Sequence, residues 1–369
     1  MTVTSSDDLS QPYTLIDLFA GAGGMTLGFT AVGFDPVFAV ESDPWAARTY
    51  KTNFGAHVLD APIETVDSFP RADVIIGGPP CQGFSPLGRD RDHRSRAKLN
   101  TLWKHYARTV EDVRPLIFVV ENVPEFLKSD QFDAFRRHCA KVLPEYELDH
   151  AILNAADYGV PQRRKRGIIL GSRIGLPAWP KKSHGDEADP QLPYRTVREA
   201  IADLPRKPTD KDLHFKRNPR PESLERYRAV PEGGNRFDLA RNRPDLLPDC
   251  WRNKPSGTTD VFGRLWWDRP SFTIRTEFFK PEKGRYLHPK EHRPITHREA
   301  ARLQTFPDDF TFEGSRTQIA KQIGNAVPPR LAEAIARSIR EHLVHATRND
   351  HAAIRSTAPG VEEGKPKLR

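Results

Sequence analysis

The chain has 369 residues, a formal net charge of +8 and 37% hydrophobic residues. That is enough for one large domain with a packed core and a smaller second domain. The 57 Lys and Arg residues outnumber the 49 Asp and Glu residues, which favours a polyanionic partner. The three widely spaced cysteines, Cys81, Cys139 and Cys250, exclude a disulfide framework and a zinc site, and they fit a reducing compartment.

No targeting or membrane segment is visible in the sequence. Residues 1–11 are polar and partly acidic, without the basic segment and apolar stretch of a secretion signal. No later apolar run reaches the length of a membrane span. We therefore expect a cytoplasmic protein with no membrane partner.

A strand and a glycine-rich turn come first in the chain. Residues 14–19 read as an apolar strand, and residues 20–24 form a tight turn whose glycines let backbone N–H groups approach a ligand. A second apolar strand over residues 36–40 ends in Glu41, where nucleotide-binding sheets place an acid against ribose hydroxyls. The alternative is that Glu41 only caps the helix that begins at Asp43.

A third, shorter strand is expected to end at Asp60, after the apolar pair Val58 and Leu59. Its carboxylate either contacts an adenine amino group or is a solvated turn residue.

A cysteine follows two prolines at the end of the next predicted strand. Residues 72–76 are apolar, and residues 77–85 read GGPPCQGFS. The prolines fix an extended approach, and Cys81 is thereby presented beyond the carboxyl end of a strand, where α/β sheets bind ligands. A small buried hydrophobe is the alternative for a lone cysteine, but the Pro and Gly neighbours favour a nucleophile.

The following segment is basic. Residues 86–98 carry four arginines and Lys98 with almost nothing apolar, so we expect a mobile loop that covers a phosphate backbone, or else a plain solvated loop.

The most apolar run of the chain follows a predicted helix over residues 99–113. Residues 115–120 read as a central strand, and Glu121 follows it directly. Because this strand end lies on the same sheet edge as Cys81, both side chains are expected to face one pocket, with Glu121 as an acid or base. A structural acid at a strand end is the alternative.

A helix over residues 130–143 holds Cys139, which we assign to the core. Before the next apolar strand, residues 167–171, Gln162, Arg164 and Arg166 occupy alternate positions of an extended segment. Alternate residues share a face, so these three are expected to converge on the pocket.

After Pro180 the composition changes. Residues 181–255 are rich in Pro, Arg, Asn and Asp and have few periodic apolar positions, which predicts a second, irregular lobe. Capping boxes at Thr196 and Thr296 predict two short helices. Residues 262–276 interleave arginines with aromatic residues, a composition that suits nucleic-acid binding or an ordinary core. The histidines at 288, 292 and 297 lack acidic or Cys partners at useful spacing, so no metal is expected.

A last amphipathic helix is predicted after residues 322–329, with Leu331, Ile335, Ile339 and Leu343 at four-residue steps. Its apolar stripe is expected to pack on the sheet of the first lobe.

These motifs together resemble the DNA (cytosine-5)-methyltransferases of bacterial restriction-modification systems. The resemblance rests on DLFAGAGG (residues 17–24), GGPPCQGFS (77–85), ENV (121–123), QRRKR (162–166), REAARLQTF (298–306) and GNAVPP (324–329), in that order. It implies an α/β, Rossmann-like methyltransferase sheet with helices on both faces and a smaller, irregular target-recognition domain. The expected boundaries are 11–185, completed by 318–346, for the catalytic domain, 186–317 for the target-recognition domain, and 347–369 for a disordered tail.

The resemblance also implies the roles of individual residues. The cofactor would be S-adenosyl-L-methionine, held by Phe19, Ala20, Gly21, Gly23, Gly24, Glu41, Ser42, Trp45, Asp60, Ala61, Pro80, Asn325 and Ala326. The catalytic residues would be Cys81, Glu121, Arg164 and Arg166. The contacts to double-stranded DNA would come from Ser85, Arg89, Arg91, Gln162, Arg264 and Arg275.

The chemistry of cytosine accounts for these residue types. Carbon 5 is a poor nucleophile, so Cys81 would first add to carbon 6 while Glu121 binds ring nitrogen 3 and the arginines hold the ring carbonyl and adjacent phosphate. The base must be flipped out of the duplex to be reached. We expect a monomer, and enzymes of this layout commonly act beside a restriction endonuclease that reads the same site.

Three alternatives remain at this stage: a tRNA cytosine-5 methyltransferase of the same architecture, a Rossmann dehydrogenase, and a DNA-binding protein without activity. The large irregular lobe favours DNA over tRNA, and a dehydrogenase leaves Cys81 and Glu121 unexplained.

Overall fold

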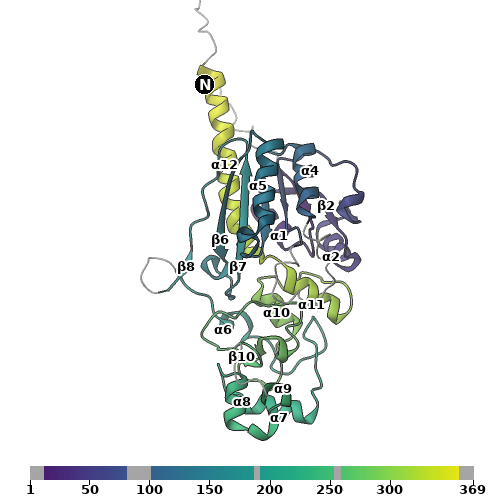
Figure 1. Ribbon diagram of the computed structural model, residues 1–369, viewed down its shortest axis with the longest axis vertical. Coiled ribbons are helices and arrows are strands. Elements are labelled where there is room, and N and C mark those ends of the chain that lie inside the picture. Colours follow the sequence, from purple (N-terminus) through teal and green to yellow (C-terminus); the bar gives the residue numbers. More distant parts are fainter. Residues whose placement is uncertain (1–11, 81–100, 187–191, 253–258, 357–369) are drawn as a thin grey trace, which may run out of the picture.

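The computed structural model describes residues 12–80, 101–186, 192–252 and 259–356, with the side chains of the last helix described to residue 346. Two lobes are stacked along the long axis of the molecule (Figure 1). The upper lobe holds a large sheet with helices, and the lower lobe consists mainly of loops and short helices.

The upper lobe is built on a seven-stranded sheet with the order β3-β2-β1-β4-β5-β7-β6. β1 to β5 run parallel to one another, whereas β7 runs antiparallel to both β5 and β6. This confirms the predicted α/β class. The strands are β1 (Thr14–Leu18), β2 (Asp35–Glu41), β3 (Val58–Asp60), β4 (Val74–Gly77), β5 (Ile117–Asn122), β6 (Glu147–Asn154) and β7 (Lys165–Ser172).

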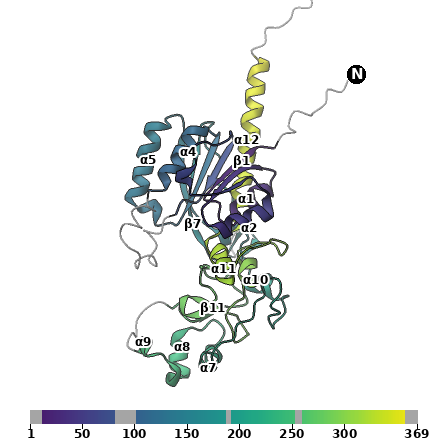
Figure 2. The same cartoon turned by 90° about the vertical axis from the view of Figure 1, so that its right-hand side faces the viewer.

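Helices cover both faces of this sheet, as Figure 2 shows. One face carries α4 (Trp103–Val113) and α5 (Asp130–Val142), and Cys139 of α5 is buried there as predicted. The opposite face carries α1 (Gly24–Thr30), α2 (Pro44–Phe54) and α12 (Pro329–Ser356). Because both faces are covered, the central strands are continuously apolar, which is why they were predictable from short runs.

The last helix returns to the first lobe. The stripe Leu331, Ile335, Ile339 and Leu343 is buried against residues of β1, β4 and β5, which confirms the predicted packing. α12 also contacts α1 closely, since a Cβ at Gly28 would lie only 2.5 Å from the Ala332 Cβ. The helix extends to Ser356, beyond residue 347, where the tail was predicted to begin.

The edge strand β6 was not predicted. It is partly exposed and interrupts its apolar residues with Asp149 and His150, so neither a continuous apolar run nor a clean alternation marks it. A separate helix, α11 (Arg316–Asn325), also precedes α12 where a single helix was predicted.

The lower lobe is irregular, as predicted. Its small core contains Tyr227, Val230, Leu239, Phe262 and Leu287. Thr196 and Thr296 form the predicted capping boxes of α6 and α10. The remaining elements of the described residues are α6 (Val197–Ile201), α7 (Pro221–Ala229), α8 (Arg236–Asn242), α9 (Asp249–Arg252), α10 (His297–Leu303), β8 (His184–Gly185), β9 (Leu192–Pro193), β10 (Gly263–Arg264) and β11 (Arg285–Leu287). Short 3-10 helices also lie between elements of both lobes.

A third apolar cluster joins the two lobes. It contains Ala22 from the turn after β1 together with residues of α6, α10 and α11, so α10 and α11 lie at the junction (Figure 1). Within the ranges described above, the structure contains no helix long and apolar enough to cross a membrane.

Candidate active site

The site lies where the strand order of the sheet reverses. From β1 the chain builds the sheet outwards to β2 and β3, and it then returns to β4 on the other side of β1. The carboxyl ends of the parallel strands at such a switch point form a crevice for ligands. The glycine turn after β1 and the segment after β4 that leads to Cys81 both start at this edge.

The turn after β1 is tightly curled. Phe19, Gly21 and Gly23 all have positive φ angles, of 57°, 57° and 86°. A Cβ at Gly23 would lie 2.3 Å from Phe54, and one at Gly24 would lie 2.5 Å from the Val327 carbonyl oxygen. Gly23 therefore satisfies both a backbone and a packing requirement, and the turn is held against the segment that joins α11 to α12.

Glu41 is fixed by this turn. Its Oε2 accepts a hydrogen bond from the Gly21 N–H at 2.8 Å, and its Oε1 accepts one from the Asp43 N–H at 2.7 Å. Burial raises the pKa of Glu41 against the opposing effect of these backbone donors. The cap of α2 is Asp43, whose Oδ1 accepts from the Trp45 and Ala46 N–H groups, so the capping alternative for Glu41 was wrong.

The other predicted cofactor residues surround this carboxylate. Asp60 pairs with Glu41 in the strand register and is exposed, and the Ala61 N–H donates to the Glu41 carbonyl. From the other side, Lys321 of α11 forms an ion pair with Asp43 at 2.6 Å. The structure thus brings together one group of predicted residues, drawn from four segments: Phe19, Ala20, Gly21, Gly23, Gly24, Glu41, Ser42, Trp45, Asp60, Ala61, Asn325 and Ala326.

The end of β5 meets the segment after β4. The Asn122 side-chain amide donates to the Pro79 carbonyl at 3.1 Å, and a Cβ at Gly78 would lie 3.0 Å from Glu121 Oε2. Glu121 is therefore next to the segment that ends at Pro80. Cys81, which follows Pro80 in the sequence, lies outside the described residues, as do Ser85, Arg89 and Arg91.

Among the described residues, Glu121 forms an ion pair with Arg166. Arg166 Nε lies 2.6 Å from Glu121 Oε1, and the two side chains are 13% and 12% exposed. β7 is antiparallel to β5 and places Glu121 opposite Ile168, so the start of β7 runs past the carboxylate. An ion pair that is largely desolvated yet still accessible can bind a polar ring and hold its orientation.

Arg164 has a different environment from the one expected of a catalytic residue. Its side chain is fully buried, and its terminal nitrogens donate to the carbonyls of Ile274, Gly324 and Ala326, each at 2.9 Å. Burial lowers the pKa of Arg164. This corrects its predicted catalytic role, because the guanidinium contacts backbone from the junction and positions the turn that holds Asn325.

Two predicted DNA contacts are also corrected. Gln162 is buried, accepts from the Ile274 N–H at 2.7 Å and donates to Gln304 at 2.8 Å, so it ties the lobes together. Arg264 is buried in the lower lobe and donates to the carbonyls of Tyr227, Val230, His288 and Glu291. The arginine–aromatic pattern did not distinguish a core arginine from a surface one.

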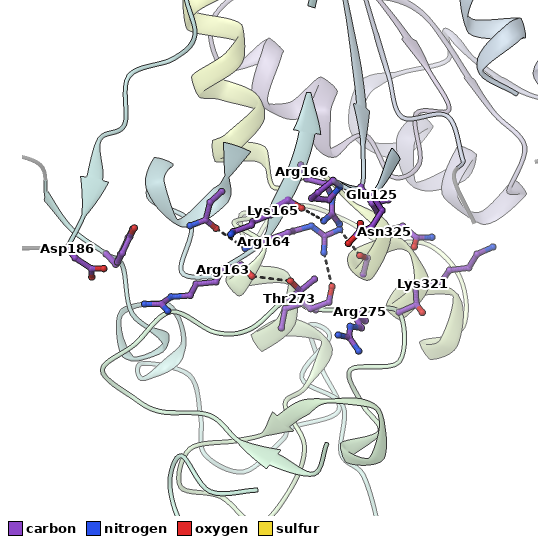
Figure 3. A pocket seen from close by; sticks show the side chains of 17 residues that line it. Glu125, Arg163, Arg164, Lys165, Arg166, Asp186, Thr273, Arg275, Lys321 and Asn325 are labelled. Carbon is purple, nitrogen blue, oxygen red and sulfur yellow. Dashed lines mark hydrogen bonds between the residues drawn. The ribbon is translucent and has the colours of Figure 1, made fainter. Parts of the chain in front are cut away.

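A cleft of about 1020 Å³ opens between the lobes beside Arg166 (Figure 3). Its cationic lining comes from both lobes and includes Arg163, Lys165, Arg166, Arg275 and Lys321 together with the buried Arg164, against the acids Glu125 and Asp186. Arg275 is exposed here, consistent with its predicted role. Arg163 and Lys165 were not among the predicted site residues. The alternation that buries Gln162 and Arg164 also exposes Arg163 and Lys165, so the same pattern could have indicated that they face the cleft.

The comparison with known proteins identifies the chain. The family described as C-5 cytosine-specific DNA methylase matches residues 13–341. The chain belongs to this family. This result confirms the predicted enzyme class, a cytosine-5 DNA methyltransferase that depends on S-adenosylmethionine, and it favours DNA over the tRNA and dehydrogenase alternatives.

Relatives of this methylase are restriction-modification enzymes. The type II methyltransferase M1.HphI of Haemophilus parahaemolyticus is 34% identical over 349 residues, covering 88% of this chain and 86% of that protein. M.PspPI of Psychrobacter sp. is 36% identical, covering 89% and 79%.

Solved structures agree on the fold. An E. coli protein described as a prophage-encoded DNA modification methyltransferase has a TM-score of 0.67 at 26% identity, covering 90% of this chain and 99% of that one. The S. pombe Dnmt2 methyltransferase, with a TM-score of 0.58 and 20% identity over 89% and 99%, shows the shared fold.

Proposed function

We propose that this methylase transfers a methyl group to carbon 5 of a cytosine flipped into the interlobe cleft, through a transient covalent bond to Cys81. The observation that carries the proposal is the ion pair between Arg166, which lines the cleft, and Glu121, which lies beside Gly78. A glutamic acid carboxyl at this position can donate its proton to ring nitrogen 3 of cytosine, the guanidinium can donate to the ring carbonyl, and the segment after Gly78 leads to the thiol.

The switch-point residues fit S-adenosylmethionine. Each Glu41 oxygen accepts one backbone N–H and retains a second lone pair, so the carboxylate can still accept hydrogen bonds from two ribose hydroxyls. A Cβ at Gly21 would meet no heavy atom within 4 Å, so there is open space beside the turn. Glu41, Asp60, Trp45 and Asn325 would hold this cofactor, which supplies an electrophilic methyl group when bound.

Cys81, Glu121 and Arg166 would each carry out a different part of the reaction. The Cys81 thiolate adds to carbon 6 of the ring, and the electron pair of the 5,6 double bond becomes available at carbon 5. Glu121, acting as the acid, donates its proton in a hydrogen bond to ring nitrogen 3 and so stabilises the charge that moves into the ring, while Arg166 orients Glu121 and donates to the ring carbonyl. After methylation, loss of the carbon 5 proton and elimination release Cys81.

The cationic lining of the cleft supports the flipping of the base. Extrusion of a paired base costs a few kcal/mol, and contacts between phosphates and lysine or arginine side chains release counterions and offset that cost. Arg163, Lys165, Arg275 and Lys321 lie on both sides of the cleft, so a duplex bound across it would contact both lobes.

Trapping with a modified substrate tests the proposal. A duplex with 5-fluorocytosine at the target cannot lose a proton from carbon 5, so the adduct should persist in the presence of S-adenosylmethionine. We expect a stable complex with the wild type and with Cys250→Ser, the exposed thiol control, and none with Cys81→Ala. An unchanged adduct in Cys81→Ala would refute the assignment.

We make two further proposals, of which the type II relatives support the first. The enzyme would protect host DNA in the cytoplasm from a restriction endonuclease that reads the same sequence, and it would act as a monomer. Bisulfite sequencing of DNA from expressing cells would reveal the methylated sequence, and light scattering with a bound duplex would give the stoichiometry. Methylation without any fixed sequence context would contradict the restriction-modification role.

A further inference from the structure

A second pocket lies at the other end of α11 from the interlobe cleft. It has a volume of about 290 Å³ and is lined by Phe215, Phe279 and His297 and by Lys216, Arg217 and Arg293, among others. It shares no lining residue with the cleft, which lies beside Gly324 and Asn325 at the end of the helix. At roughly 1.5 Å per residue, α11 separates the two sites by about 14 Å. Methyl transfer as proposed above uses none of these residues.

The walls of this α11 pocket are aromatic. His297 is buried, with its ring centroid 5.0 Å from that of Phe215 and 6.0 Å from that of Phe279, to which it lies nearly parallel at 13°. Burial lowers the pKa of His297 to about 4, so the ring is neutral at physiological pH. Its Nε2 donates to the Arg316 carbonyl at 2.7 Å. Phe215 and Phe279 are only partly buried, and such rings suit the stacking of a planar ligand.

Cationic side chains lie at the rim of the pocket. Lys216 and Arg217 are exposed, and within the described part of the chain neither side chain forms an ion pair. Arg316, by contrast, pairs with Asp210 at 3.1 Å, and its guanidinium lies 4.5 Å from the centre of the Phe215 ring. The rim therefore offers two unneutralised cations beside an aromatic wall.

Arg293 adds a buried donor. Its terminal nitrogens donate to the Glu299 carboxylate at 2.8 and 2.7 Å, but its Nε is buried with no hydrogen-bond partner among the described residues. Arg293 lines the pocket, and a ligand oxygen is one way to satisfy its Nε.

We infer that the α11 pocket binds a nucleotide, with the base against the Phe215, Phe279 and His297 rings and the phosphate at Lys216 and Arg217. The volume is at the lower end of small-molecule sites, which start at about 300 Å³, so it suits one base with its phosphate. The nucleotide is either free or part of a DNA strand that leaves the cleft. Since a strand advances about 3.4 Å per nucleotide, about four nucleotides span the length of α11.

Binding measurements on the full chain test this inference. The protein is first saturated with S-adenosylhomocysteine, so that the cofactor site is occupied. It is then titrated by calorimetry with 2′-deoxyadenosine monophosphate and, separately, with single-stranded hexadeoxyadenylate, which contains no cytosine. We expect saturable binding of at least one ligand that Lys216→Glu weakens at least tenfold.

Two further variants separate stacking from general charge. Phe279→Leu retains an apolar side chain but removes the ring, and it should weaken binding between about fivefold and a hundredfold. Arg340→Glu makes the same charge change as Lys216→Glu, but on the exposed side of α12, and should leave the affinity unchanged within about twofold. Both Lys216 and Arg340 are exposed, so neither variant should prevent folding.

The two ligands identify the source of the nucleotide. Pocket-dependent binding of the monophosphate indicates a free nucleotide, and pocket-dependent binding of the oligonucleotide alone indicates a DNA strand; both support the inference. Absence of binding by either ligand, or binding that Lys216→Glu and Phe279→Leu leave unchanged, overturns it. Because methyl transfer is not measured, failure of the proposed reaction would not affect this result.

Discussion

Replacement of Arg164 by Met should destabilise the protein more than any other arginine substitution near the cleft. The side chain is fully buried and donates to three backbone carbonyls, those of Ile274, Gly324 and Ala326. A hydrogen bond that involves a charged group contributes about 1.5–3 kcal/mol. Met fills most of the volume but leaves all three carbonyls unpaired in the interior.

The net loss is smaller than the sum of the three bonds, because the variant no longer buries a charge. A buried acceptor left without its donor costs about 1–3 kcal/mol, so three of them, less the relieved burial of the charge, amount to about 3–5 kcal/mol. We expect the free energy of unfolding to fall by that amount, which is a large part of the 5–15 kcal/mol typical of folded proteins. Arg164→Lys should recover little, since a single ammonium cannot reach carbonyls on both sides as the two guanidinium nitrogens do.

Urea denaturation followed by circular dichroism measures this loss. Arg163→Met is the matched control, because Arg163 is the preceding residue and is exposed, so its replacement should cost less than about 0.5 kcal/mol. The affinity for S-adenosylhomocysteine should also fall in Arg164→Met, because the Gly324 and Ala326 carbonyls that Arg164 binds lie on either side of Asn325. If Arg164→Met unfolds within 1 kcal/mol of Arg163→Met, the proposed role of the buried guanidinium is refuted.

Three other substitutions test separate parts of the site. Glu41→Gln places an amide NH₂ against one of two backbone donors and should weaken S-adenosylhomocysteine binding at least tenfold by calorimetry. Asp17→Asn should change the pH dependence of stability: burial raises the pKa of Asp17 to about 7 from 3.8, so its contribution is full below about pH 4 and is lost as the pH rises through 7. The melting temperature of the variant should therefore rise relative to wild type over that range, by the equivalent of at most about 4 kcal/mol. Arg275→Ala should reduce the salt dependence of duplex binding by about one unit of log Kd per log salt concentration.

Each of these expectations has an outcome that contradicts it. Equal cofactor affinity in Glu41→Gln and Asp60→Asn would mean that the buried carboxylate is no more important than the exposed one. A constant difference in melting temperature between Asp17→Asn and wild type from pH 4 to 8 would show that Asp17 does not titrate there. An unchanged salt slope in Arg275→Ala would place the DNA elsewhere, and Arg340→Ala serves as the control for a cation distant from the cleft.

Local sequence was enough to predict the elements that form the site. Buried parallel strands require continuous apolar residues, so β1, β2, β4 and β5 were visible as short runs. The turn after β1 requires glycine for its positive φ angles, and Glu41 follows the next strand at the same edge. The edge strand β6 was not visible, because one of its sides is exposed and carries charged residues.

The sequence by itself determined which residue types gather at the switch point, since strand ends, turns and alternation are local properties. Only the tertiary structure decided what each arginine does. Arg164 and Arg166 occupy alternate positions of one extended segment, but their environments differ. Arg164 is buried and donates to carbonyls more than a hundred residues away in the sequence, whereas Arg166 pairs with Glu121 and lines the cleft. Arg264 is buried and Arg275 is exposed for the same reason. The burial of an arginine depends on the distant backbone groups that surround it, and the residues next to it in the sequence do not reveal those groups.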